Sequence, residues 1–254
     1  MRMIVITTTA TLRPDILERT LSSFRQYMFT DDILRRIRVE MVINIDPAGP
    51  GDVREVMDVP GRYFSVIATR NPVQAGFPAA FRWAWSKAAE SLSALYVFHL
   101  EDDWILSRPI DVLDMIRVLE SNPDLAVLRL PAFHAGTETM KNWNLHFPWN
   151  GSFYECPEDL KITAGFCGHP SLIRMEFVKN SAHLLEGDRN PEKQFHRGGP
   201  PELLREVLRW RYGVYASPGS LPAIRDIGRE WMVKNNLSKA GSKAFFTHWE
   251  RYNA

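Results

Sequence analysis

The chain has 254 residues, 45% of them hydrophobic and 24% charged, with a formal net charge of +1. This composition excludes an intrinsically disordered protein, and the near-neutral charge excludes an overall field that would attract a polyanion. The apolar run at the start is too short for a signal peptide, and no stretch approaches the roughly 20 apolar residues of a membrane span. Cys156 and Cys167 are the two cysteines, which offers no metal-ligand spacing and suits a reducing compartment. We therefore expect a cytoplasmic protein.

Apolar runs and amphipathic segments alternate along the first 130 residues. The sequence predicts strands at 3–9, at 38–51 up to the break at Pro47, and at 63–71, 94–100 and 125–130, and helices at 13–28, 76–92 and 109–123. Pro14 stands at the start of the first helix, where its missing N–H costs nothing. Strand–helix alternation of this kind predicts an α/β fold with a mostly parallel sheet that helices cover on both faces.

The second half of the chain has a different pattern. Residues 131–160 are rich in aromatic and amide side chains and show no clear period. A short strand leading into a helix is predicted within 164–180, and a helix followed by a strand within 200–217. The tail at 223–254 mixes basic, aromatic and small residues, as a flap would. We find no repeat or linker, so we expect one domain over residues 1–254.

Three consecutive carboxylates, Glu101, Asp102 and Asp103, follow the apolar run at 94–100. In parallel sheets, ligands collect beyond the carboxyl ends of the strands. Mg²⁺ and Mn²⁺ prefer oxygen ligands and commonly bridge one or two carboxylates to substrate phosphates, and such a cation would relieve the repulsion between these acids. The alternative is that the acids cap the next element or face water. The position of the cluster favours a divalent cation site.

The motifs, taken in order, resemble those of the GT-A glycosyltransferases, especially glycosyltransferase family 2. The acids after the fourth strand look like the Asp-X-Asp motif, and the segments 5–24, 42–49, 68–85 and 164–178 are similar to the segments that precede and follow it in the family. The resemblance covers roughly residues 3–230 and is strongest up to about residue 106. It implies a GT-A, Rossmann-like fold with a nucleotide-sugar-binding half at 1–130 and an acceptor-side half with a C-terminal flap at 131–254.

The resemblance also implies which residues bind the donor, a nucleoside-diphosphate sugar, with UDP-glucose and other UDP-sugars favoured from the family. An opening loop touches the nucleotide, a terminal Asp of the second strand contacts the base or ribose, and a later segment closes over the nucleotide. At matching positions stand Thr7, Thr8, Thr9, Asp46, Asn71, Gly76 and Ala80.

The same resemblance predicts a cation, Mn²⁺ or Mg²⁺, at Asp103 with Glu101 nearby. Asp102 is expected to hydrogen-bond the ribose or the donor sugar. A late His that often meets the metal or the diphosphate in the family has Asp226 in its place. The cation would neutralise charge that builds on the leaving diphosphate.

Four further residues are candidates for the donor site. Arg229 and Lys234 in the tail could fold over the diphosphate, or could belong to a solvated basic stretch. Arg70 could contact the nucleotide or be a surface cation. Trp104, directly after the acids, is expected to line the site.

A catalytic base must take the proton of the acceptor hydroxyl. The family usually has a Glu-Asp pair after the acceptor-side strand, and this sequence has none there. Spacing favours Glu192, then Glu202 and then Asp188 as the base. A carboxylate opposite the departing diphosphate predicts inversion at the anomeric carbon.

Two acceptors are compatible with the sequence. One is a saccharide or a lipid-linked saccharide. The other is a hydroxymethylated base in DNA, because the chain also resembles small phage-type glycosyltransferases, which would act in a host cytoplasm; such an enzyme needs phosphate contacts. Candidates for those contacts are Arg35, Arg36 and Arg38, or Lys239, Lys243 and Arg251. We expect most aromatic residues of the central loop to be packing residues, and the isolated histidines to be structural: Trp143, Phe147, Trp149, Phe153, Tyr154, His134, His146 and His169.

Two other classes of protein remain as alternatives. A nucleotidyltransferase of similar fold also uses metal-bound acids, but no lysine-containing, glycine-rich phosphate loop is seen near Thr7. A non-catalytic sugar-binding or nucleic-acid-binding module would not need three carboxylates at the ligand end of a sheet. The sequence does not indicate an oligomeric state.

Overall fold

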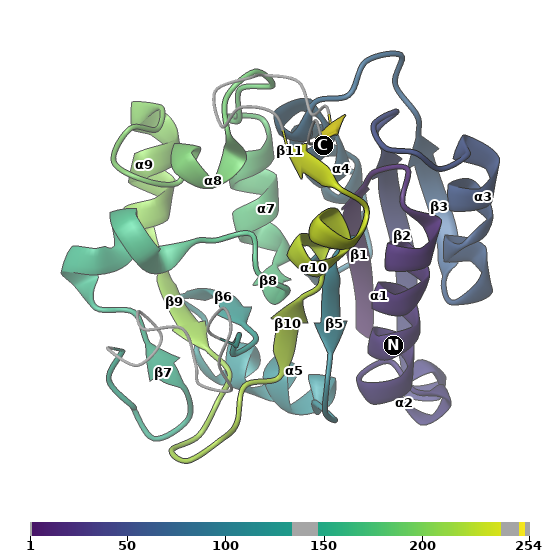
Figure 1. Ribbon diagram of the computed structural model, residues 1–254. Coiled ribbons are helices and arrows are strands. Elements are labelled where there is room, and N and C mark those ends of the chain that lie inside the picture. The colour runs from purple at the N-terminus through teal and green to yellow at the C-terminus, as the bar shows by residue number, and fades with distance from the viewer. Residues whose placement is uncertain (1, 134–146, 240–248, 252–254) are drawn as a thin grey trace.

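An eight-stranded sheet forms the centre of the computed structural model, which describes residues 2–133, 147–239 and 249–251 (Figure 1). Its strands lie in the order β3-β2-β1-β4-β8-β6-β9-β7. Their bounds are β1 Arg2–Ala10, β2 Ile37–Ile45, β3 Ser65–Arg70, β4 Tyr96–Glu101, β6 Leu125–Arg129, β7 Tyr154–Glu155, β8 Ser171–Arg174 and β9 Arg211–Val214. Two small antiparallel pairs accompany it: β5 Trp104–Leu106 with β10 Ile224–Asp226, and β11 Leu237–Lys239 with β12 Trp249–Arg251.

The first four strands of this sheet, β3, β2, β1 and β4, are parallel, which confirms the prediction for this part. The predicted fifth strand forms as β6, but it does not pair with β4. Instead β8, from the second half of the chain, lies between β4 and β6 and is antiparallel to both. Hydrophobic periodicity predicts that a segment is a strand, but it does not encode which neighbour the strand will pair with.

The sheet is buried on both faces, because successive side chains of a strand point to opposite sides. In β1, Ile4 and Ile6 join one core cluster while Met3 and Val5 join the other. Three helices pack into the first cluster: α1 Pro14–Tyr27, α3 Val53–Asp58 and α5 Val112–Ser121. Three others pack into the second: α4 Phe77–Ala89, α7 Met175–Ala182 and α9 Pro201–Arg209. The remaining helical segments are α2 Asp31–Arg36, α8 Pro191–Gln194, α10 Gly228–Lys234, the 3-10 turns Pro60–Arg62 and Glu158–Leu160, and a π-helical turn at Lys161–Gly165.

The predicted helices form as α1, α4 and α5, and the predicted strand–helix and helix–strand units of the second half form as β8–α7 and α9–β9. No element was predicted over α3, which is six residues long. A helix of that length spans fewer than two turns, so a 3.6-residue period is barely visible in it.

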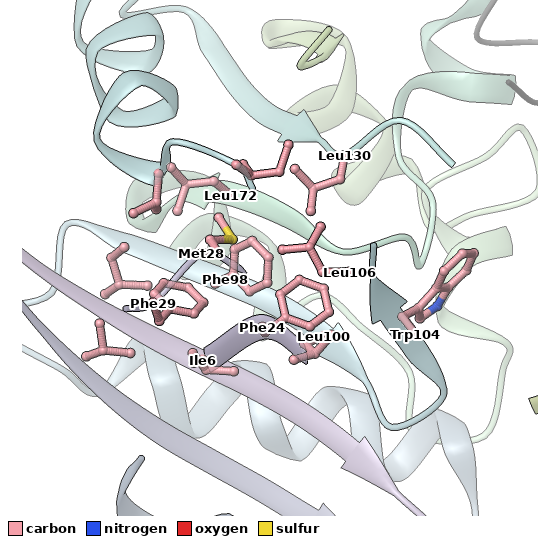
Figure 2. Packing of buried hydrophobic residues seen from close by; sticks show 14 of the residues in the cluster. Ile6, Phe24, Met28, Phe29, Phe98, Leu100, Trp104, Leu106, Leu130 and Leu172 are labelled. Atoms are coloured by element: carbon pink, nitrogen blue, oxygen red, sulfur yellow. The ribbon is translucent and has the colours of Figure 1, made fainter. Parts of the chain in front are cut away.

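Aromatic packing fixes the strand that leads into the acidic cluster. Figure 2 shows Phe98 of β4 between Phe24 of α1 and Phe29. The ring centroid of Phe98 lies 5.6 Å from that of Phe24 and 5.4 Å from that of Phe29. Edge-to-face and tilted contacts of this kind stabilise a core beyond the burial of area alone. The end of β4 therefore rests on a rigid support.

The tail returns to the centre of the molecule rather than extending from it. Its strand β10 pairs with β5 in the register Trp104↔Asp226, and Figure 1 shows both strands beside α10 and α1. Helix α10 packs through Trp231 and Ile227 against Ile16 of α1. None of the helices in the described part of the chain combines the length and apolar composition that crossing a bilayer requires.

A buried histidine in β4 makes the stability of the fold sensitive to acid. His99 packs beside the rings of Phe81 and Trp85, and burial lowers its pKa from 6.5 to about 3. Below pH 6.5 the unfolded chain therefore takes up a proton that the native protein does not, and the free energy of unfolding falls as the pH falls. We expect this group to contribute a loss of about 2 kcal/mol between pH 6.5 and 4.5.

Urea unfolding at several pH values measures this contribution. The neutral variant His99→Gln should lose less stability than the wild-type protein over the same pH range. Equal acid sensitivity of the two proteins would contradict the expectation.

Candidate functional site

A cavity of about 360 Å³ opens at the carboxyl ends of β1, β2 and β4, where the parallel half of the sheet was predicted to bind its ligand. Charged side chains dominate its wall. They comprise six carboxylates, Asp46, Glu101, Asp102, Asp103, Glu192 and Asp226, and two guanidinium groups, Arg13 and Arg229. The formal balance of these groups is −4. An anionic ligand cannot enter such a cavity favourably unless a cation accompanies it.

Asp102 is held by protein groups from the start of α1. One carboxylate oxygen accepts from the backbone N–H of Thr11 at 3.0 Å, and the other accepts from Nη2 of Arg13 at 2.6 Å. The side chains of Arg13 and Asp102 are only 4% and 5% exposed. Burial raises the pKa of Asp102, and the charge of Arg13 opposes that shift. Both oxygens of Asp102 are thus engaged within the protein, and Asp102 also lines the cavity. Its contact with the ribose or the sugar stays a prediction.

Asp103 faces Asp226 across the pairing of β5 with β10. The backbone N–H of Ile227 donates to the carbonyl oxygen of Asp103 at 2.8 Å, which brings the two carboxylates to the same point of the cavity. Burial raises the pKa of Asp226, and the negative charge of Asp103 raises it further. Binding of a cation between the two carboxylates would relieve this repulsion.

Glu101 and Glu192 approach each other at a different wall of the cavity, around Gly168. The N–H of Gly168 donates to Oε1 of Glu192 at 2.9 Å. A Cβ atom at position 168 would lie 2.6 Å from Oε1 of Glu101, so any larger residue there would push the Glu101 carboxylate aside. The segment before Gly168 is anchored by buried Arg129, which donates to the carbonyl oxygen of Ala164 at 2.9 Å. The three consecutive acids thus enter three different environments.

The residues predicted to touch the nucleotide are only partly brought together. Thr9 and Asp46 line the cavity, whereas Thr7 and Thr8 are buried within β1 and do not. Asp46 accepts from the side-chain amide of Asn44 at 2.7 Å and from the N–H of Gly76 at 2.9 Å. Asp46 and Gly76 therefore join the end of β2 to the start of α4.

Two other residues of the predicted closing segment serve the scaffold. Asn71 donates to the carbonyl oxygen of Ile45 at 2.7 Å, and Ala80 is buried in α4. Arg70 donates to the carbonyl oxygen of Ala79 at 3.3 Å and is not part of the cavity wall.

Of the remaining predicted site residues, three line the cavity: Trp104, Arg229 and Glu192. Trp104 is buried and its ring lies 4.8 Å from that of His169. Glu202 lies on α9 in an exposed pair with Arg205, and it does not line the cavity. The other residues outside the cavity wall are Asp188 and Lys234, both exposed.

The basic residues proposed for DNA contacts do not border the cavity. Arg38 pairs in register with Met3, at the amino end of β1, and Arg35 and Arg36 precede it. The cavity begins at Thr9, and six residues of strand separate it from this end by roughly 20 Å. For Lys239 and Arg251 the backbone is described but the side chains are not, and Lys243 lies outside the described residues.

Within the central loop, Phe147 and Phe153 are buried, as expected for packing residues. Trp149 and Tyr154 lie against each other, with ring centroids 5.4 Å apart. The predictions for Trp143, His134 and His146 fall outside the described residues.

Arg13 is the site residue that the sequence reasoning missed. It bridges two of the acids, at 2.6 Å from Asp102 and 3.2 Å from Asp103. Its burial lowers its pKa, but the two carboxylates raise it more, so the group stays charged. An arginine directly before the helix-starting Pro14 was the available signal. Its position at the end of the loop after β1 puts it at the same sheet edge as the acids.

The described residues contain no group of three His, Cys, Asp or Glu side chains placed to hold a metal ion. The paired carboxylates of Asp103 and Asp226 nevertheless fit a hard divalent cation, which often takes only one or two carboxylates when substrate phosphates complete its shell. A cation at Asp103 with Glu101 nearby stays a prediction; Asp102 is paired with Arg13, and Glu101 lies next to Gly168 in the wall of the same cavity.

Gly228, the first residue of α10, offers a test of the close packing around Asp103. A Cβ atom at this position would lie 2.9 Å from Cγ of Asp103 and closer still to Oδ2. We expect Gly228→Ala to displace the Asp103 carboxylate and to weaken Mn²⁺-dependent UDP binding at least about tenfold, which calorimetry would measure. Gly61→Ala is the control, because nothing lies within 4 Å of a Cβ atom there. Unchanged binding by Gly228→Ala would contradict the described position of Asp103.

No family model matches this sequence, and a search of curated proteins finds no match either. Solved structures do resemble it in fold. The crystal structure of S. aureus TarS, a GT-A-type glycosyltransferase, superposes with a TM-score of 0.58 at 10% identity, over 89% of this chain and 36% of that chain. TarS 1–349, alone and in complex with UDP, gives TM-scores of 0.56 and 0.55, each at 10% identity and over 89% of this chain and 60% of that one.

The chain has a Rossmann-like α/β fold of the GT-A type. It spans 36% of the TarS chain and 60% of TarS 1–349. At 10% identity the likeness concerns the fold.

Proposed function

We propose that this protein is a divalent-cation-dependent glycosyltransferase that moves a sugar from a UDP-sugar to an acceptor hydroxyl. The observation that carries the proposal is the acidic cavity at the ligand end of the parallel strands, in which Asp103 and Asp226 face each other. A diphosphate would be repelled by a formal charge of −4, whereas a diphosphate with a divalent cation would not. The GT-A-type fold and the UDP complex of TarS support the same donor class.

Asp103 and Asp226 would hold the cation, Mn²⁺ or Mg²⁺, which when bound neutralises charge on the departing diphosphate. Arg229 reaches the same cavity from α10 with an exposed side chain, so it can pair with the phosphates. Thr9 and Asp46 at the ends of β1 and β2 border the part of the cavity that would take the nucleoside.

Glu192 is the residue best placed to act as the base. In the reaction its carboxylate takes the proton of the acceptor hydroxyl, the acceptor oxygen bonds to the anomeric carbon, and the bond from that carbon to the diphosphate oxygen breaks. The N–H of Gly168 holds one oxygen of Glu192, which leaves the other for the acceptor. Attack from the side opposite the diphosphate inverts the anomeric carbon.

The acceptor that fits this site best is a saccharide hydroxyl. Glu101 and Trp104 line the same cavity as Glu192, so the cavity combines hydrogen-bond acceptors with an aromatic side chain. A nucleic-acid acceptor would bring phosphates to this acidic wall, while Arg35, Arg36 and Arg38 lie at the other end of the sheet.

A thermal-shift screen of nucleotide sugars, each with and without Mn²⁺, tests the proposal. We expect stabilisation that requires both a UDP-sugar and the cation, followed by release of UDP when saccharide acceptors are added. Release of pyrophosphate would indicate a nucleotidyltransferase instead, and ligand affinity indifferent to the cation would indicate a binding module. Retention on DNA that falls steeply with added salt would favour the nucleic-acid acceptor.

A further inference from the structure

Arg13 places a permanent positive charge inside the acidic site. Its Nη2 atom lies 2.6 Å from Oδ1 of Asp102 and 3.2 Å from Oδ2 of Asp103, and its side chain is 4% exposed. The guanidinium therefore already contacts Asp103, one of the two carboxylates that would hold the cation under the proposed function. Asp102 and Asp103 stand 89 and 90 residues further along the chain, so only the fold creates this contact.

The contacts around Arg13 hold its guanidinium in this position. Its Nε donates to the hydroxyl of Thr11 at 2.8 Å, and its guanidinium carbon lies 5.5 Å from the ring centroid of Trp231. The indole N–H of Trp231 donates to Asp15 at 3.0 Å. Helix α10 thus covers Arg13 and limits its movement away from the acids.

We propose that Arg13 is an internal counter-ion that keeps the acidic site from binding a divalent cation alone, so that the cation and the diphosphate enter together. This inference rests on the proposed function, and it adds that Arg13 determines when the cation binds. Its basis is that Arg13 neutralises Asp102 and already interacts with Asp103. The other carboxylate of the pair, Asp226, lies 3.6 Å from Nε of the exposed Arg229.

The physical reason is the balance of charge at one carboxylate. A divalent cation at Asp103 would lie within a few ångströms of the guanidinium, and like charges at that separation in a partly buried site repel strongly. The two negative charges of a diphosphate offset this repulsion and supply further oxygen ligands beside Asp103 and Asp226. The absence of a three-residue metal group among the described residues agrees with this arrangement.

Two variants separate the charge of Arg13 from its structural role. In R13Q/D102N a pair of amides replaces the buried ion pair, so a hydrogen bond can remain and no unpaired charge is buried. In D102N alone, Arg13 keeps its charge and its contact with Asp103. Calorimetric titration with Mn²⁺ alone, and then with Mn²⁺ in the presence of UDP, measures the affinity in each protein, and thermal unfolding verifies that each is folded.

We expect R13Q/D102N to bind Mn²⁺ alone at least about tenfold more tightly than the wild-type protein, and D102N to bind it no more tightly. Structural damage would weaken binding in both variants, so a gain in one of them is specific to the lost charge. Addition of UDP should raise the Mn²⁺ affinity of the wild-type protein more than that of R13Q/D102N.

Equal or weaker Mn²⁺ binding by R13Q/D102N would overturn the role of Arg13, as would binding by D102N that is as tight as that of the double variant. If R13Q/D102N does not fold, R13K decides: it keeps the charge and should bind Mn²⁺ alone as weakly as the wild-type protein, and tighter binding would overturn the proposal. If UDP does not raise the Mn²⁺ affinity of any of these proteins, the proposed function is rejected instead. The two failures are distinguishable, because the role of Arg13 is tested with Mn²⁺ alone and the proposed function is tested with Mn²⁺ and UDP.

Discussion

Asp103→Asn is expected to lower the rate of UDP release from a UDP-sugar by about a thousandfold. Asp103 is one of the two facing carboxylates, it is 24% exposed to the cavity, and its neighbour Asp102 is engaged by Arg13 and Thr11 and cannot replace it. An amide keeps the size of the side chain but removes the negative charge that would hold the cation. We therefore expect binding of Mn²⁺ with UDP to be lost together with turnover.

Calorimetry with Mn²⁺ and UDP, and a coupled assay for UDP release, measure the two effects. Asp58→Asn is the matched control, because Asp58 is exposed at the end of α3 and does not line the cavity. The control should behave as the wild-type protein. Turnover of Asp103→Asn within about tenfold of the wild-type rate would show that the cation, if required, is held elsewhere.

Glu192→Gln is expected to lower the turnover rate by a factor of about 10² to 10⁴, while Mn²⁺-dependent UDP binding stays intact. The amide oxygen of Gln can still accept from the N–H of Gly168, so the local structure has no reason to change. What is lost is the ability to take a proton from the acceptor. A variant that binds the donor normally but does not transfer its sugar is the signature of a missing base.

Glu202→Gln is the control for this experiment. Sequence spacing made Glu202 the second choice for the base, but the structure places it on the exposed face of α9, in an ion pair with Arg205 and outside the cavity. We expect its turnover to be unchanged. If Glu202→Gln loses activity and Glu192→Gln does not, the assignment of the base must be exchanged.

The parallel half of the fold could be predicted from the sequence because its pattern is local. Residues 3–9 form an apolar run that becomes β1, and Ile16, Leu17, Leu21 and Phe24 recur at helical spacing and become the buried face of α1. The ligand end of the sheet followed from the same alternation, since the loops after β1, β2 and β4 meet at one edge. Glu101 and Asp103 were found in this way, whereas Glu192 was chosen by its spacing in the family resemblance, and all three line the cavity.

The strand order and the second sheet could not be predicted in the same way. Strand β8 enters between β4 and β6, and β5 becomes a strand only because β10 returns to pair with it. Three-residue strands such as Trp104–Leu106 and Ile224–Asp226 are too short to carry a period of their own. Their pairing nevertheless places Asp226 next to Asp103.

The sequence by itself determined the α/β class, the position of the acids at the ligand end of the sheet, and the resemblance that predicts sugar transfer. Only the tertiary structure decided what each acid meets: Asp102 meets Arg13, Asp103 meets Asp226, and Glu101 meets Gly168. The physical reason is the range of the interactions concerned. Hydrophobic periodicity is a property of neighbouring residues, whereas the counter-charge of a carboxylate is set by groups that folding brings from about 90 residues away.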